Sequence, residues 1–350
     1  MNRLMLASAS GLLGFYLLFS AVPRYLGDGM SAGMATAALM LGTVLLELAV
    51  PWLLSRYGYR RVLSAGLILL GPPSLALPLK DLVLPISLLR GAGLGIVVVA
   101  GTALVAELIP AERRSEGLGL YGVAVGVPSI IGLPLGLWAG DHLGFGPVFV
   151  LAGLVPLAGL VAAAKLPDLK PAQHRDQSKS GNGLTAPIVV FGAVALAAGV
   201  AITFLPLAAS PKLASAALLA QSLLTPAARW WAGRHAGPRW LAPSVLAAAA
   251  GVGLLFWSAE PWAVVAGMAL FGAGFGVAQN LTLTLMFERG QAGRVSAMWN
   301  LAYDAGMGVG ALGLGVVMGA TGYPLGFALV AVVVLATLPL TGNRKPSMVR

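Results

Sequence analysis

Charged residues are rare in this sequence, and they occur in short clusters. The 350 residues include 22 Lys or Arg and 12 Asp or Glu. The clusters are separated by apolar stretches of roughly 20 to 25 residues, and a helix of about 20 residues crosses the ~30 Å hydrocarbon layer of a bilayer. The pattern therefore predicts an integral membrane protein built from transmembrane helices.

Twelve apolar stretches are long enough to be spans. Residues Lys212, Gln221, Pro226 and Arg229 make the eighth stretch the least apolar. The predicted spans cover residues 5–22, 30–54, 61–79, 83–108, 116–140, 146–166, 185–208, 212–232, 240–258, 262–287, 293–319 and 323–342.

The distribution of basic residues predicts the orientation of these spans. With a cytoplasmic amino terminus and twelve crossings, 18 Lys and Arg residues fall on the cytoplasmic side and 3 on the other, while Arg90 lies inside the fourth stretch. Such a bias is typical of membrane proteins. We therefore expect a multi-pass protein of the cell membrane with both termini in the cytoplasm. The net charge of +10 then indicates contact with anionic lipid headgroups rather than with nucleic acid.

The composition argues against several kinds of chemistry. Cysteine is absent, and His142, His174 and His235 all fall in predicted loops. Disulfides and thiolate metal sites are therefore excluded, and we expect no metal, no cofactor and no enzymatic activity. No GxxxxGK[ST] loop is present, which disfavours ATP as an energy source. The expected partners are a small-molecule substrate, protons and membrane lipids, and the expected oligomeric state is a monomer.

The chain divides near its middle at a hydrophilic segment. We predict a six-helix bundle over residues 1–166, a cytoplasmic linker over 167–184 and a second six-helix bundle over 185–350. A repeat relates the halves: RGAGLG at 90–95 matches FGAGFG at 271–276 with an offset of 181, and a loop pair matches with an offset of 179. Two similar six-helix halves are typical of a secondary transporter.

The loop after the second span carries a family resemblance. Its residues Arg56, Gly58 and Arg60 match the signature of the major facilitator superfamily, whereas Ser55 stands where the family has an Asp. The sequence resembles this superfamily along its whole length, and most of all its twelve-helix, proton-linked drug and metabolite exporters. The resemblance implies an all-α fold of two pseudo-symmetric six-helix bundles.

Two further segments extend the resemblance. In the fourth span, Arg90, Gly93 and Gly95 match the second signature of the family, and Glu107 occupies the position of a family acid. We expect Glu107 to form a salt bridge with Arg56 or Arg60, so that the loop acts as a conformational gate.

The fifth span is rich in small residues and prolines. Glycines at intervals of about four residues allow close approach of a partner helix, and prolines remove internal hydrogen bonds and bend helices. The residues expected to pack or bend this span are Gly122, Gly126, Pro128, Gly132, Pro134 and Gly136.

Three ionisable residues lie well inside predicted spans, namely Glu47, Arg90 and Asp304. A charge at the bilayer centre costs roughly 2.5 to 3.5 kcal/mol on insertion scales, so these groups are expected to be functional. Our hypothesis is that Arg90 is the fixed cation of a translocation path and that Asp304 or Glu47 binds and releases protons. The alternative is that backbone carbonyls hold Arg90 and that Glu47 forms a static pair.

Polar and aromatic residues of the tenth and eleventh spans are candidates for contact with a substrate. They are Gln279, Asn280, Trp299, Asn300 and Tyr303. Asn300, Tyr303 and Asp304 share a helical face, although hydrogen bonds between helices would also explain them. The predicted function is proton-coupled export of a small amphipathic compound by an antiporter. Uptake of a sugar or other nutrient, and a non-transporting sensor or scaffold on the same fold, are the alternatives.

Overall fold

The computed structural model describes residues 1–108, 114–170, 183–289 and 292–342. These residues form helices joined by short turns, and the described ranges contain no strand. The α-helices are α1 (Asn2–Leu26), α2 (Gly29–Leu70), α3 (Val83–Leu108), α4 (Arg114–Leu143), α5 (Phe145–Ala163), α6 (Thr185–Ala208), α7 (Pro211–His235), α8 (Leu241–Leu254), α9 (Pro261–Arg289), α10 (Ala292–Thr321) and α11 (Tyr323–Leu335). The prediction of an all-α protein is confirmed.

Helix α2 covers two of the predicted spans and is bent between them. Gly58 has a φ of 78° and interrupts the helical backbone, a conformation that glycine adopts without steric cost. The predicted spans 30–54 and 61–79 correspond to the two arms of α2, and each other predicted span corresponds to one of the other ten helices. The sequence therefore located every described helical segment.

Helix α7 differs from its neighbours in composition. By length and apolar character, ten helical segments of the described chain qualify as membrane spans, and α7 is not among them. Its polar residues Gln221 and Ser222 are buried, because α7 packs against α9 and α4. The face of α7 that contacts other helices therefore carries polar residues, whereas Leu219, Leu223 and Trp230 are exposed.

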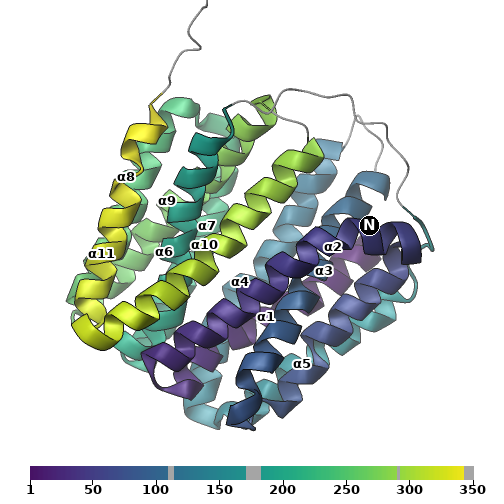
Figure 1. Ribbon diagram of the computed structural model, residues 1–350, viewed down its shortest axis with the longest axis horizontal. Coiled ribbons are helices and arrows are strands. Elements are labelled where there is room, and N and C mark those ends of the chain that lie inside the picture. Colours follow the sequence, from purple (N-terminus) through teal and green to yellow (C-terminus); the bar gives the residue numbers. More distant parts are fainter. Residues whose placement is uncertain (109–113, 171–182, 290–291, 343–350) are drawn as a thin grey trace, which may run out of the picture.

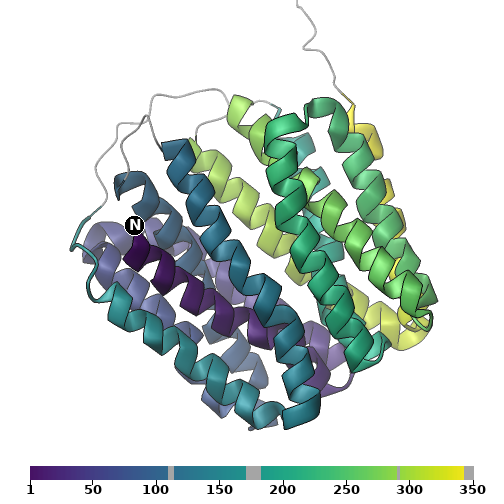
Figure 2. The ribbon, with the colours of Figure 1, turned by 180° about the vertical axis from the view of Figure 1, so that it is seen from behind.

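The helices form two groups that follow the order of the chain. Figure 1 places α1 to α5 on one side of the molecule and α6 to α11 on the other, and the view from behind in Figure 2 shows the same division. Contacts between the two halves involve α2 with α10, α4 with α7, and α1 with α6. A site shared by both halves must therefore lie along these helices.

One face of the molecule carries both ends of the described chain and the junction between the halves. Arg3 Nη1 donates a hydrogen bond to the Lys165 carbonyl at 2.9 Å, and Arg289 Nη1 donates to the Gly183 carbonyl at 2.9 Å. We call this the termini face, and we call the other side, where α1 joins α2 at Gly27, the opposite face.

The glycines of the first half of the repeat pack α3 against both arms of α2. A Cβ atom on Gly95 would lie 2.5 Å from the Thr43 carbonyl oxygen on the first arm, and Gly91 meets the Leu39 carbonyl in the same way. Gly93 faces the second arm, where a Cβ atom would lie 2.5 Å from the Leu70 nitrogen. Only glycine allows α3 to approach two helices this closely.

The glycines of the second half make the equivalent contacts. Gly272 and Gly276 face the backbone of α7, at Gln221 and Thr225 respectively, whereas Gly274 faces α8. The two arms of α2 therefore correspond to α7 and α8, and the repeat in the sequence is a repeat of helix packing.

The glycines of α4 do not all serve packing. Gly132 and Gly136 lie against α1, at Tyr16 and Leu17. A Cβ atom on Gly126, in contrast, would meet nothing within 4 Å, so the expected helix contact is absent at this position. The surroundings of Gly122 lie outside the described residues. Helix α4 continues through Pro128 and Pro134.

The loop at Gly58 binds the segment that follows α5. The Tyr59 amide donates to the Leu169 carbonyl at 2.9 Å, and Arg60 Nη2 lies 3.1 Å from Asp168 Oδ2. Arg60 therefore pairs with Asp168, whereas the salt bridge from Glu107 to Arg56 or Arg60 stays a prediction. Glu107 is exposed at the end of α3.

Two other residues of this loop also make local contacts. Arg56 lies over the rings of Trp52 and Tyr57, at 5.9 and 5.7 Å from their centroids. Ser55 donates a hydrogen bond to the Trp52 carbonyl at 2.8 Å, so its hydroxyl group bonds within its own helix.

Replacing Asp168 by Asn is expected to lower the free energy of unfolding by less than about 1 kcal/mol, because exposed ion pairs contribute little. Thermal melting of the purified protein measures the change. The backbone bond from Tyr59 to Leu169 does not depend on the carboxylate, so it should persist. A larger loss of stability would mean that the ion pair, not the backbone contact, holds the loop.

Candidate functional site

Two carboxyl groups from different halves meet near the middle of the molecule. The side chains of Glu47 on α2 and Asp304 on α10 lie within reach of a hydrogen bond to each other. Glu47 precedes Gly58 by 11 residues and Asp304 follows Ala292 by 12, which places both about 16–18 Å from the termini face along their helices. Asp304 is 6% exposed. The pair is therefore a buried contact across the interface of the halves.

The contact between these carboxyl groups requires a proton. An ionised carboxylate only accepts hydrogen bonds, so one partner must be protonated to donate. Loss of that proton would leave two negative charges facing each other in a poorly solvated site, and their repulsion would oppose the contact. A hydrogen bond between Glu47 and Asp304 would thus be a link between the halves that depends on protonation.

The surroundings of the carboxyl pair come from α10 itself and from two further helices, α1 and α3. Gly95 on α3 packs against the Glu47 side chain, because a Cβ atom built at position 95 would lie 3.2 Å from Glu47 Cγ. Tyr16 on α1 and Tyr303 on α10 lie near enough to Asp304 to interact with its charge. Oε1 of Glu47 is buried and has no hydrogen-bond partner among the described residues, so the pair retains a free acceptor.

Aromatic rings stack beside the carboxyl pair in the second half. The Phe191 ring on α6 lies 4.3 Å from Trp299 and 5.9 Å from Tyr303 between centroids. Phe275 on α9 lies 6.0 Å from Tyr303. Trp299 Nε1 also donates to Thr282 Oγ1 at 3.3 Å. These flat rings form a continuous apolar wall.

Tyr303 and Asp304 therefore face different partners. Tyr303 belongs to the aromatic wall, and Asp304 reaches α2. The expectation that Asn300, Tyr303 and Asp304 share one helical face stays a prediction. Asn300 is half-buried.

Arg229 also lies in this region, although its charge was counted among the basic residues of the cytoplasmic side. Arg229 lies inside α7, where its Nη1 donates to Gln279 Oε1 at 3.4 Å and its guanidinium group lies 5.8 Å from the Trp299 ring centroid. Arg229 therefore lies within the helix that forms the predicted span 212–232. Gln279 is buried at this contact. Asn280 instead lies near Gly233 and lines a pocket between α7 and α9.

Arg229 occupies the position in the second half that Glu47 occupies in the first. Gly276 approaches the Arg229 nitrogen as Gly95 approaches the Glu47 nitrogen. One turn earlier, Thr225 and Thr43 each donate a hydrogen bond to the carbonyl four residues before. An offset of 182 residues relates 47 to 229, close to the 181 of the glycine repeat. Extending that repeat would have placed Arg229 inside the membrane.

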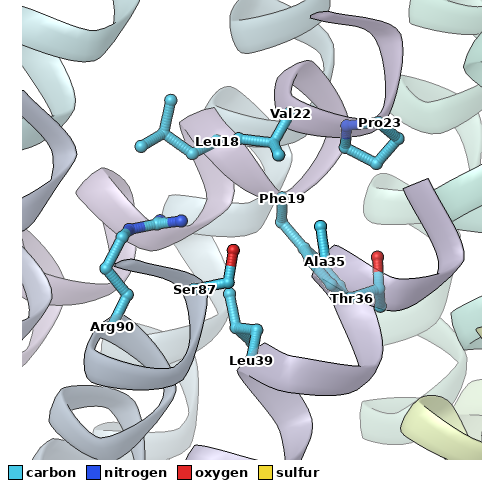
Figure 3. A pocket seen from close by; sticks show the side chains of 9 residues that line it. All are labelled: Leu18, Phe19, Val22, Pro23, Ala35, Thr36, Leu39, Ser87 and Arg90. Atoms are coloured by element: carbon cyan, nitrogen blue, oxygen red, sulfur yellow. The ribbon is translucent and has the colours of Figure 1, made fainter. Parts of the chain in front are cut away.

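Arg90 is buried between helices of the first half, closer to the opposite face. It is 1% exposed, and its Nε and Nη2 atoms have no hydrogen-bond partner among the described residues. Figure 3 shows its guanidinium group extending into a small pocket bounded by α1, α2 and α3. No backbone carbonyl of the described chain accepts from these two nitrogens, which argues against Arg90 as a group held by the backbone.

Contacts between the halves continue from the carboxyl pair toward the opposite face. Thr203 on α6 donates to Thr36 on α2 at 3.1 Å, and Arg24 Nη1 donates to the Pro206 carbonyl at 3.4 Å. Gly33 on α2 lies against the Ala311 carbonyl on α10, where a Cβ atom would be 2.5 Å away. The two halves are therefore closed against each other on the side of the opposite face.

This arrangement of two repeated helical halves agrees with comparisons to known proteins. The chain matches the family profile of the Major Facilitator Superfamily over residues 4–212. The protein therefore belongs to the Major Facilitator Superfamily of membrane transporters.

The curated relatives are distant and longer. The uncharacterized MFS-type transporter Rv1250 of Mycobacterium tuberculosis is 28% identical over 173 residues, covering 46% of this chain and 30% of that protein. The uncharacterized MFS-type transporter Rv1877 of the same organism is 28% identical over 142 residues, covering 40% of this chain and 21% of that protein. The match thus spans less than a third of the length of these relatives.

Solved structures share the fold at low sequence identity. A bacterial homolog of the human lysosomal transporter Spinster, in an inward-facing and occupied conformation, has a TM-score of 0.76 at 13% identity and covers 97% of this chain and 95% of its own. The nucleoside transporter NupG has a TM-score of 0.74 at 14% identity, covering 97% and 98%. These similarities support the fold over nearly the whole chain.

Proposed function

We propose that this protein is a secondary active transporter that moves a small organic molecule by alternating access, and that protons drive it as an exporter of an amphipathic compound. The observation that carries the proposal is the close approach of the Glu47 and Asp304 carboxyl groups across the interface of the halves. Alternating access needs a contact between the halves that a transported species can make or break, and a proton shared by two carboxyl groups has this property.

The proposed cycle couples protonation to the relative position of the halves. With the shared proton in place, the link between α2 and α10 and the contacts near Thr36 and Arg24 favour closure on the opposite face. Release of the proton turns the link into a repulsion and favours separation of the halves. The basic loops support the assignment of the termini face to the cytoplasm, which makes this conformation inward-facing in our proposal.

The proposed substrate path runs beside the carboxyl pair. The aromatic wall of Trp299 and Tyr303 suits an apolar or aromatic part of a substrate, and Gln279 and Arg229 suit a polar part. Arg90 is the fixed cation of the path on the side of the opposite face. An amphipathic compound has the mixture of surfaces that these residues complement.

Reconstitution into liposomes tests the proposed function. A panel of fluorescent amphipathic compounds and labelled sugars is offered with and without an imposed pH gradient, and internal pH is followed at the same time. We expect accumulation of at least one amphipathic compound only when the gradient is present, with opposite movement of protons. Flux of sugars in the same direction as protons would favour nutrient uptake. The absence of any flux, together with no stabilisation by any compound, would favour a sensor or scaffold.

A further inference from the structure

The guanidinium group of Arg90 lacks a counter-charge. It is 1% exposed, and two of its nitrogens are unpaired. Arg24 pairs with Asp141 and Arg60 pairs with Asp168, and neither ion pair involves Arg90. A buried charge without a partner is costly. We therefore expect Arg90 to interact with a ligand that is not part of the protein.

The pocket in front of Arg90 has the chemistry of an anion site. Ser87 lies one turn before Arg90 on α3 and lines the same pocket, and Thr36 lies across it on α2 (Figure 3). None of the residues that line the pocket is acidic. Thr36 accepts a hydrogen bond from Thr203, which leaves its own hydroxyl proton available to donate. The polar groups of the pocket are thus donors from three different side chains.

The rest of the pocket limits the kind of anion. Leu18, Phe19 and Val22 of α1 form an apolar wall beside the guanidinium group. A carboxylate or sulfonate of charge −1 would be neutralised by Arg90 alone, through paired hydrogen bonds. A dianion would keep one charge unpaired in a poorly solvated site. Phe19 also stacks on Phe15, 4.9 Å between centroids, so an apolar surface continues from the pocket along α1.

We propose that Arg90 binds the anionic group of the transported compound, which makes the substrate a monoanionic amphipathic molecule such as an aryl or alkyl carboxylate. This inference rests on the proposed transport function and narrows its substrate class. Thr36 contacts Thr203 of the other half from the wall of the same pocket. Occupation of the pocket therefore acts directly on a contact that closes the opposite face.

The test measures binding to the purified full-length protein without a proton gradient. The probes are 4-phenylbutyrate and its neutral analogue 4-phenylbutyramide, with sodium chloride as a third arm, and the readouts are thermal melting and calorimetric affinity. We expect the carboxylate, but not the amide, to raise the melting temperature with increasing concentration. Equal effects of carboxylate and amide, or no effect of the carboxylate, would overturn the inference. The inference would also be overturned if chloride raised the melting temperature and the carboxylate raised it no further, since the site would then bind a small inorganic anion.

Two variants connect the binding to Arg90. Arg90→Gln is expected to weaken carboxylate binding at least about tenfold and to melt no lower than the parent without ligand, because it removes an unpaired charge. Ser87→Asp supplies an internal carboxylate one turn from Arg90, and it should abolish the effect of the probe while keeping the guanidinium group. Undiminished binding in either folded variant would overturn the assignment. If the carboxylate binds but no proton-driven flux is seen, the transport proposal is refuted and this inference stands. If proton-driven flux is seen for neutral compounds only, this inference is refuted and the transport proposal stands.

Discussion

Replacing Asp304 by Asn is expected to reduce proton-driven flux to the level of protein-free liposomes. The amide that this substitution introduces can still donate a hydrogen bond to Glu47, so the link between α2 and α10 can form. The amide cannot bind or release a proton, so the link no longer responds to the pH gradient. The measurement is initial uptake of the compound identified by reconstitution, with and without a pH gradient, at equal protein content.

Two controls make this result specific. Exchange of labelled for unlabelled compound without a gradient should persist in Asp304→Asn, because exchange needs binding and movement but no net proton transfer. Asp81→Asn removes a carboxylate from the exposed segment η2 (Lys80–Leu82) and should leave flux unchanged. Gradient-driven uptake at the parental rate in Asp304→Asn would exclude this residue from the coupling.

Glu47→Gln examines the other member of the pair. The single proton of the pair would then have only Asp304 as a titrating site, facing an amide instead of a second carboxyl group. We expect gradient-driven flux to fall in this variant as well, with exchange retained. Parental coupling in Glu47→Gln together with its loss in Asp304→Asn would assign the proton to Asp304 alone and would contradict the shared site.

Replacing Gly136 by Val should cause the largest loss of stability among the substitutions considered. A side chain at this position would collide with the backbone of Leu17 on α1, which cannot move without shifting a whole helix. Overpacking of this kind costs about 1–3 kcal/mol and occasionally more. Thermal melting in detergent and the yield of monodisperse protein measure the effect.

Gly126→Val is the matched control for this substitution. Gly126 lies in the same helix, and a Cβ atom there would meet nothing within 4 Å. Both variants carry the same change in intrinsic helix propensity, about half a kcal/mol or less, so their difference isolates the contact with α1. Equal melting temperatures of the two variants would show that α4 and α1 are not packed through Gly136.

The fold was largely predictable because the bilayer imposes a strict rule on composition. Stretches of about 20 apolar residues indicate helices, since a helix pairs its backbone polar groups within a single segment. The polar residues Gln221 and Ser222 of the least apolar stretch, α7, are buried, and α7 packs against α9 and α4. Counting charged clusters therefore identified the helices, and the glycine repeat identified the equivalence of the halves.

The candidate site was predictable only in part. Glu47, Asp304 and Arg90 stand out because ionisable residues inside apolar stretches are costly. Their partners do not follow from the sequence, because the contact between α2 and α10 joins residues more than 250 positions apart. Arg229 was not recognised as a site residue because it lies within two turns of the end of α7. A basic residue at such a position is interpreted as part of the basic cluster that flanks the span. The binding of Arg60 by Asp168 depends on how the chain returns after α5, and no local pattern indicates it.

The equivalence of Glu47 and Arg229 has a consequence for how a molecule is oriented in transit. The two halves repeat the same backbone packing, yet they place an acid on one side and a base on the other at the same relative position. We therefore expect an electric field that points from Arg229 on α7 toward the carboxyl pair of α2 and α10. We expect a dipolar solute between the halves to adopt one alignment, with its electron-rich end toward Arg229, before either side opens.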